Sequence, residues 1–311
     1  MIVNILLIIV GFVLLIKGAD FLVDGASNIA KKLHIPEIVI GLTIVSIGTS
    51  MPELFVSITS ALEGYPDMSI GNVVGSNIAN LFLILGLTAA VRPIPFKKAT
   101  IKFEIPLCLG ATILLFVLAN TGKTITRMES FGMLLAFSLF IVYTFVLAKK
   151  ARGKDKKEKS KTPIWKDILL LVLGIVGLKF GGDFTVDNAV EVAKILGVSE
   201  KIISVTILAV GTSLPELVTS LSAAKKGETD LAIGNIIGSN IFNFLLIVGV
   251  SSAIKPIAYN VSYNRDLIVL FASVILLLIF SYTKPKGKMS RSNGIIYFLG
   301  YVAYLAMLFL I

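Results

Sequence analysis

Long apolar stretches recur along almost the whole chain and are separated by short polar segments. A transmembrane α-helix needs about 20 predominantly apolar residues, and ten windows reach that length. We therefore expect an all-α membrane protein of ten transmembrane helices, with no room for a soluble domain. The first basic residue, Lys17, follows the first apolar run, whereas a signal peptide carries its positive charge ahead of it, so this run is predicted to be a span. The expected spans are 2–24, 37–62, 69–91, 100–120, 126–148, 164–187, 200–224, 231–254, 264–283 and 291–311.

Two similar halves flank one polar segment, residues 149–163, which holds eight basic and two acidic residues. A shift of 163 positions aligns Gly18–Pro93 with Gly181–Pro256 without a gap, and nearly half of the aligned residues are identical. Such self-similarity indicates a duplication. Because each half has five predicted spans, an odd number, the second half must enter the membrane from the opposite side, as in many secondary transporters. We expect a five-helix repeat over 1–148, a basic cytoplasmic linker over 149–163 and an inverted five-helix repeat over 164–311.

The basic residues predict the orientation, because cytoplasmic loops near the membrane carry an excess of Lys and Arg. If the linker is cytoplasmic, 21 basic residues lie on its side of the membrane, six lie on the other side and two lie inside spans. We therefore expect an integral protein of the cell membrane with both termini outside and the linker inside.

Composition excludes several classes of function. Hydrophobic residues make up 56% of the chain and charged residues 15%, against about a quarter charged in soluble domains. The net charge of +10 sits in short runs between apolar stretches, so it does not indicate nucleic-acid binding. A single cysteine, Cys108, and a single histidine, His34, exclude an internal disulfide, a histidine-based metal cluster and a Ser-His-Asp triad. We expect no enzyme, no cofactor and no obligate protein partner.

Two glutamates fall near the middle of predicted spans. Glu53 and Glu216 occupy equivalent places in residues 48–54 (GTSMPEL) and 211–217 (GTSLPEL). Burying a charged side chain near the bilayer centre costs at least about 2.5–3.5 kcal/mol, so such residues are functional candidates. The alternative is a role in helix packing. Two buried carboxylates argue against it, because each carries this energetic cost. Each glutamate follows a proline, which donates no backbone hydrogen bond, so both helices are expected to be unwound there beside a cavity.

The third and eighth predicted spans carry matching polar residues. Residues 70–80 and 233–243 share Ile-Gly-Asn, Gly-Ser-Asn-Ile and a final Asn. The serine and the final asparagine are four residues apart and lie on one helix face. Oxygen atoms suit Ca²⁺ and Na⁺ better than transition metals, and two glutamates supply the −2 charge that balances one Ca²⁺. The candidate ligands are the carboxylates of Glu53 and Glu216, the hydroxyls of Thr49, Ser50, Ser76, Thr212, Ser213 and Ser239, and the amide oxygens of Asn80 and Asn243.

These paired motifs resemble the two α-repeats of the calcium/cation antiporter superfamily, most closely its prokaryotic sodium/calcium exchangers. The resemblance covers the whole ten-span plan and implies exchange of about three Na⁺ for one Ca²⁺ by alternating access. It implies that the same side chains are ligands, completed by the backbone carbonyls of Ser46 and Ala209. In the family, the first and sixth spans slide over the other eight. Potassium-dependent members carry aspartate at the position of Asn243, so a potassium site is not expected.

Three alternatives stay open at this point. A calcium/proton antiporter is the main one, because a glutamate in an empty, dry site could bind a proton in competition with cations. The hydroxyl-rich motifs favour sodium over protons. An intramembrane hydrolase could use paired carboxylates, but the hydroxyls and the duplication suit ion binding better, and a passive channel would not drive uphill flux. Separately, Lys17 with Asp20 and Lys179 with Asp183 have the spacing of intrahelical ion pairs.

Overall fold

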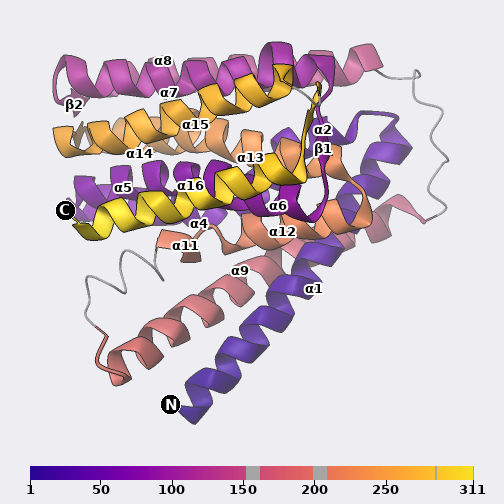
Figure 1. Cartoon of the computed structure of the whole chain (residues 1–311), viewed down its shortest axis with the longest axis horizontal. Coiled ribbons are helices and arrows are strands. Elements are labelled where there is room, and N and C mark those ends of the chain that lie inside the picture. The colour runs from indigo at the N-terminus through magenta and orange to yellow at the C-terminus, as the bar shows by residue number, and fades with distance from the viewer. Residues whose placement is uncertain (152–161, 199–208, 284–285, 311) are drawn as a thin grey trace.

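The computed structural model describes residues 1–151, 162–198, 209–283 and 286–310, and these residues are almost entirely helical (Figure 1). Helix formation follows from the apolar windows, because in a bilayer every backbone polar group must be satisfied within the protein. The long uninterrupted helices are α1 (Ile2–Leu33), α7 (Ile105–Thr121), α8 (Arg127–Ala151), α9 (Ile164–Ile195), α15 (Asn264–Tyr282) and α16 (Arg291–Leu310).

Short turns of π-helix interrupt the other helices. In the first half the order is α2 (Glu37–Ile40), a π-helical turn (Gly41–Val45), α3 (Ser46–Thr49), α4 (Met51–Glu63), α5 (Pro66–Ile78), a π-helical turn (Ala79–Leu85) and α6 (Gly86–Val91). In the second half it is α11 (Ala209–Gly211), α12 (Leu214–Lys226), α13 (Thr229–Phe242), a π-helical turn (Asn243–Ile247) and α14 (Val248–Ile254). A π-helical turn (Thr100–Glu104) precedes α7, and a 3-10 turn (Val261–Tyr263) precedes α15.

Seven helical stretches of the described residues are long and apolar enough to cross a membrane. The bent pair Glu37–Thr49 and Met51–Glu63 can form an eighth span. The other two expected spans, 200–224 and 291–311, include residues outside the described ranges, as does most of the expected linker. The chain is thus a mostly helical membrane protein, and the ten-span plan stays a prediction. Helices α1 and α9 reach 32 residues each, longer than expected, because helix continues beyond the apolar windows into charged sequence.

The two halves have equivalent elements. The bounds of α4 and α12 differ by 163 residues at both ends, as the sequence shift predicts. Strand β1 (Ile94–Pro95) pairs antiparallel with β4 (Lys288–Met289), and β2 (Thr124–Ile125) pairs antiparallel with β3 (Ile257–Ala258). Since β1 and β3 are equivalent under the same shift, each half contributes one strand to each of these two short ladders.

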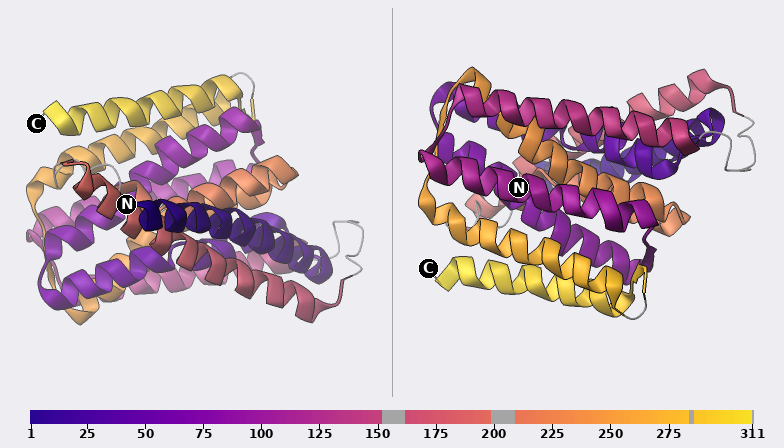
Figure 2. Two further views of the ribbon diagram at one scale, coloured as in Figure 1. Left: turned by 90° about the horizontal axis from the view of Figure 1, so that it is seen from below. Right: turned by 90° about the horizontal axis from the view of Figure 1, so that it is seen from above.

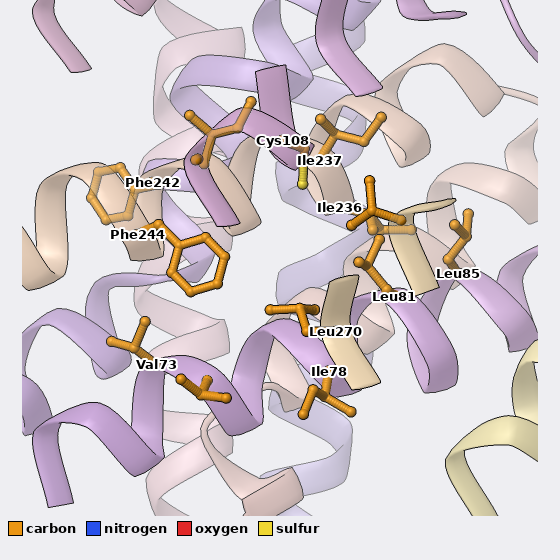
Figure 3. Close-up of a cluster of buried hydrophobic side chains, with 14 of the residues drawn as sticks. Val73, Ile78, Leu81, Leu85, Cys108, Ile236, Ile237, Phe242, Phe244 and Leu270 are labelled. Carbon is orange, nitrogen blue, oxygen red and sulfur yellow. The ribbon is translucent and has the colours of Figure 1, made fainter. Parts of the chain in front are cut away.

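Helices α5 and α13 lie at the centre of the molecule. Within their membrane-crossing stretches, 83% and 94% of the most apolar window is buried, against 17% for α8. Apolar side chains from these two helices meet those of α7 and α15, including Val73, Ile237, Cys108 and Leu270 (Figure 3). The polar residues of α5 and α13 are therefore held among packed neighbours.

Helices α1 and α9 form a separate pair that crosses one face of the bundle obliquely (Figures 1 and 2). Glycines bring their backbones into contact. A β-carbon on Gly18 would lie 2.8 Å from the backbone nitrogen of Leu178, and one on Gly181 would lie 2.7 Å from that of Leu15. Small residues permit such close crossings in membranes.

Candidate ion-binding site

The expected breaks lie next to both proline–glutamate pairs. Ser50 separates α3 from α4 with φ −87° and ψ 10°, and the two segments meet at 49°. Ser213, its counterpart before α12, has φ −89° and ψ 5°. A proline at the second position of α4 and of α12 needs no donor there, so the helix restarts at this point. Each break therefore turns its serine and glutamate into the interior.

Both glutamates are fully buried, and each accepts a hydrogen bond from the opposite repeat. Ser50 Oγ donates to Glu216 Oε1 at 2.7 Å. Ser213 Oγ donates to Glu53 Oε1 at 3.4 Å. The two broken helices, 163 residues apart in sequence, thus form one shared site rather than one site each.

Serines from the central helices contact the same carboxylate oxygens. Ser76 on α5 donates to Glu53 Oε1 at 3.5 Å, and Ser239 on α13 donates to Glu216 Oε1 at 3.4 Å. Each glutamate therefore receives one serine from its own repeat and one from the other. The structure brings together the carboxylates and serines that the sequence singled out.

The second oxygen of each glutamate is buried and has no hydrogen-bond partner among the described residues. The same holds for Asn243 Oδ1 and for both amide atoms of Asn80. Buried polar atoms without partners are rare in native proteins and each needs an explanation. Five such atoms belong to carboxylates and amides that the sequence indicates as ion ligands, and others, among them Glu104 Oε2, lie on residues that are not expected ligands.

The π-helical turns explain how the two asparagines reach the site. Asn80 is the second residue of one such turn, and Asn243 is the first residue of another. A π-helical turn adds one residue to a helix and shifts its face, and such turns are common at functional sites. The regular spacing from serine to asparagine in sequence gives no sign of this distortion.

The hydrogen bonds of the two threonines and of the two expected carbonyl ligands differ between the repeats, unlike those of the serines. Thr49 Oγ1 lies 3.4 Å from the Ser46 carbonyl oxygen and donates to Asn235 Oδ1 at 3.1 Å. Thr212 Oγ1 lies 3.5 Å from Ser76 Oγ. The Ser46 carbonyl also accepts from the Ser50 N–H at 3.0 Å.

In the second half the Ser213 N–H bonds to Val210 instead of to Ala209. The break there is thus a tighter turn. Among the described residues, no hydrogen bond to the Ala209 carbonyl is seen in this turn.

Sequence reasoning missed the supporting asparagines. Asn72 Nδ2 donates to the backbone oxygen of Glu53 at 3.0 Å and to Ser57 Oγ at 2.9 Å. Asn235 Nδ2 donates to Ser220 Oγ at 3.1 Å. The sequence did indicate them, because the same asparagine occurs in both copies of the repeat. A polar residue that is present twice in a buried helix is expected to form a hydrogen bond in each copy.

A cavity of about 690 Å³ between α4, α5 and α9 reaches the site. Ser76, Thr212 and Gly75 line its inner part, and a β-carbon on Gly75 would meet nothing within 4 Å. The equivalent Gly238 is packed, since its β-carbon would lie 2.7 Å from Ser46 Oγ. The outer part of the cavity is lined by polar and charged residues that include Asp67, Tyr263, Lys179, Asp183 and Asp187.

One of the two expected intrahelical ion pairs is confirmed. Lys179 Nζ lies 2.7 Å from Asp183 Oδ2. The expectation for Lys17 with Asp20 is wrong, because Asp20 accepts from Ser222 Oγ at 2.7 Å and lies 3.5 Å from Lys226 Nζ. Packing of α1 against α12 supplies partners that spacing along one helix does not show.

Comparisons with known proteins agree over the full length. The family model described as "Sodium/calcium exchanger protein" matches residues 3–146 and 166–310. The sodium/calcium exchanger MaX1 of Methanosarcina acetivorans is 36% identical over an alignment of 349 residues that covers 99% of each chain. Inner membrane protein YrbG of Escherichia coli is 34% identical over 319 residues, covering 97% of this chain and 96% of YrbG. A solved structure of the sodium-calcium exchanger NCX_Mj, soaked with 2.5 mM Na⁺ and 0.1 mM Ca²⁺, is similar with a TM-score of 0.86, 32% identity and 98% coverage of each chain.

Proposed function

This chain belongs to the sodium/calcium exchanger family, whose members are transporters and not enzymes, and on that premise we propose that it exchanges Na⁺ for Ca²⁺ by alternating access at the shared site of Glu53 and Glu216. The observation that carries the proposal is the unpartnered oxygen on each buried carboxylate. A cation bound between the two carboxylates would satisfy both oxygens. The ten side chains singled out in the sequence and the carbonyls of Ser46 and Ala209 would supply the ligands.

The donor chemistry favours Ca²⁺ and Na⁺. Calcium takes six to eight oxygens at about 2.3–2.6 Å in flexible geometry, whereas Mg²⁺ demands a tight octahedron. Two broken helices and two central helices can surround an ion with carboxylate, hydroxyl and amide oxygens. Because both glutamates serve every ion, bound Ca²⁺ and bound Na⁺ exclude each other, and this competition favours exchange over cotransport.

The orientation follows from the basic residues, with both termini outside and the cell membrane as the location. In that orientation Asp67 and Tyr263 lie at the outer face, so the cavity opens outward. The inner side is closed by α1 against α12, where Lys226 Nζ lies 2.7 Å from Asp24 Oδ1. The equivalent of Lys226 in the first half is Glu63, so the outer side lacks this attraction.

Two inverted repeats supply the second, inward-open state. Exchange of the conformations of the two halves would close the outer path and open the inner one, and the reciprocal pairing of β1 with β4 and β2 with β3 supports equivalent halves. Helices α1 and α9 are the elements expected to slide. Their glycine-lined contact would let the pair move as one body.

Uptake of ⁴⁵Ca²⁺ into proteoliposomes under one imposed gradient at a time tests the proposal. An outward Na⁺ gradient should drive uptake against a calcium gradient, and outward H⁺ or K⁺ gradients should not. Uptake driven by H⁺ alone would establish the calcium/proton antiporter instead. Dissipation of a calcium gradient with no uphill uptake under any of the three gradients would indicate a channel.

A further inference from the structure

A short chain of amides links the two repeats beside the ion site. Asn77 on α5 and Asn243 on the π-helical turn after α13 are both fully buried. Asn243 Nδ2 donates to Asn77 Oδ1 at 2.9 Å. Asn77 Nδ2 in turn donates to the backbone oxygen of Asn240 at 3.4 Å. Asn77 was not among the ligands expected from the sequence, and its side chain is used by these two bonds.

The donor-to-acceptor direction of these two hydrogen bonds is set by the last acceptor, the backbone carbonyl of Asn240. A carbonyl oxygen only accepts, so the NH₂ group of Asn77 must face Asn240 and its oxygen must face Asn243. That oxygen needs a donor, so Asn243 turns its own NH₂ group toward Asn77. Asn243 Oδ1 is left buried with no partner in the described structure. A reversed Asn243 amide would put two acceptors in contact, so its orientation is determined by its neighbours.

The equivalent residues of the other half do not form this chain. Asn240, the counterpart of Asn77, donates to the Ile236 carbonyl within its own helix at 2.7 Å. Asn80, the counterpart of Asn243, has no hydrogen bond on either amide atom among the described residues. Packing of the duplicated halves therefore does not by itself require the amide chain. One of the two site amides is oriented before an ion arrives, and the other is not.

We propose that Asn77 is a positioning residue that holds the oxygen of Asn243, and not its NH₂ group, toward the transported cation. The inference rests on the proposed function, because it names how one ligand of that site is oriented. An amide oxygen binds Ca²⁺ or Na⁺, whereas an NH₂ group in its place repels a cation. A ligand fixed in its bound orientation also reduces the cost of ordering on binding.

Substitutions at position 77 test this by ⁴⁵Ca²⁺ binding to the purified protein and by the KM and kcat of sodium-driven exchange. Asn77→Ala frees the Asn243 amide to turn, so Ca²⁺ binding should weaken by about fivefold, the equivalent of one typical net hydrogen bond. KM for Ca²⁺ should rise by a similar factor, with kcat changed less. Asn77→Asp keeps an acceptor opposite Asn243, and its buried carboxyl group, when protonated, can donate to the Asn240 carbonyl in place of the Asn77 NH₂ group, so this variant should bind Ca²⁺ more tightly than Asn77→Ala. Equal weakening by both substitutions would overturn the proposal in favour of a packing role.

A double-mutant cycle shows whether Asn77 acts through Asn243. The effect of Asn77→Ala should vanish in an Asn243→Ala background, because the amide to be oriented is gone. Asn240→Ala is the matched control, since it keeps the backbone oxygen that anchors Asn77, and its effect should be equal in both backgrounds. An undiminished Asn77→Ala effect in the Asn243→Ala background would overturn the proposal. Asn77→Ser, whose hydroxyl is shorter, replaces Asn77→Ala if the latter does not fold. Wild-type protein that binds no Ca²⁺ would refute the proposed function, and this inference with it.

Discussion

At the scale of single residues, Glu53 and Glu216 bring two carboxylates into the interior without a basic partner. Their side-chain hydrogen bonds come from serine and threonine hydroxyl groups. A carboxylate buried among neutral groups is costly unless a cation compensates it. The proposed site is therefore incomplete without its ions, and stability as well as transport should depend on them.

Glu53→Gln and Glu216→Gln should each abolish calcium exchange while the protein still folds and inserts. Glutamine preserves size but removes half of the charge that compensates Ca²⁺. Ca²⁺ should raise the thermal unfolding midpoint of the wild type, since a ligand that binds only the folded state stabilises it, and should leave both variants unchanged. The measurements are ⁴⁵Ca²⁺ flux and unfolding followed by labelling of Cys108, which is 2% exposed in the folded protein.

The matched control is Glu104→Gln. Glu104 is also fully buried but lies outside the site, where it accepts from Tyr143 at 2.7 Å, a bond that glutamine can also accept. This variant should retain exchange. Wild-type flux in Glu53→Gln or Glu216→Gln protein would refute the assignment of the site.

Asn80 and Asn243 predict that exchange needs no potassium. Both positions are neutral and buried, so the site holds only two carboxylates and lacks a third to balance a further cation. Sodium-driven uptake should be equal in potassium-free medium and in medium with added potassium. An absolute requirement for potassium would show that charge counting at these two positions is misleading.

At the scale of helices, the crossing of α1 and α9 depends on the absence of side chains at the contact. Gly18→Ala should destabilise the protein by about 1–3 kcal/mol, because the added carbon would meet the backbone of α9, which cannot move without the whole helix. Exchange should slow as well, if this pair slides. Gly132→Ala on α8 is the control, since its added carbon meets nothing within 4 Å, and it should be neutral or stabilising by up to about 1 kcal/mol. Equal unfolding midpoints for the two variants would argue against a tight crossing.

At the scale of the whole molecule, transport should carry charge. The two glutamates carry a charge of −2, so the site is neutral with one Ca²⁺ bound and has a net charge of +1 with about three Na⁺ bound. The two loaded states therefore cannot both be neutral. Moving one charge through 100 mV is worth about 2.3 kcal/mol. Such a voltage should shift the equilibrium calcium ratio about fifty-fold at fixed Na⁺. Liposomes clamped with valinomycin and a potassium gradient measure this, once potassium independence is established, and a ratio insensitive to voltage would mean electroneutral exchange.

The sequence by itself predicted most of the helical segments and the candidate ligands of the site. Apolar length and proline position are local properties, so the helices and the breaks at Ser50 and Ser213 follow from them directly. The duplication identified the paired glutamates, serines and asparagines, because a buried polar residue present twice has a role in both copies. Neither the ends of α1 and α9 nor the π-helical turns at Asn80 and Asn243 could be predicted, since both depend on packing against neighbouring helices.

Only the tertiary structure decided which groups are partners. Ser50 meets Glu216 of the other repeat, and Asp20 meets Lys226 instead of Lys17, because these contacts join helices far apart in sequence. The structure also decided which atoms stay free. The orientation of the Asn243 amide depends on the polarity of Asn77, which in turn depends on a backbone carbonyl. A hydrogen-bond chain of this kind exists only when three segments are already packed together, so no local pattern in the sequence can encode it.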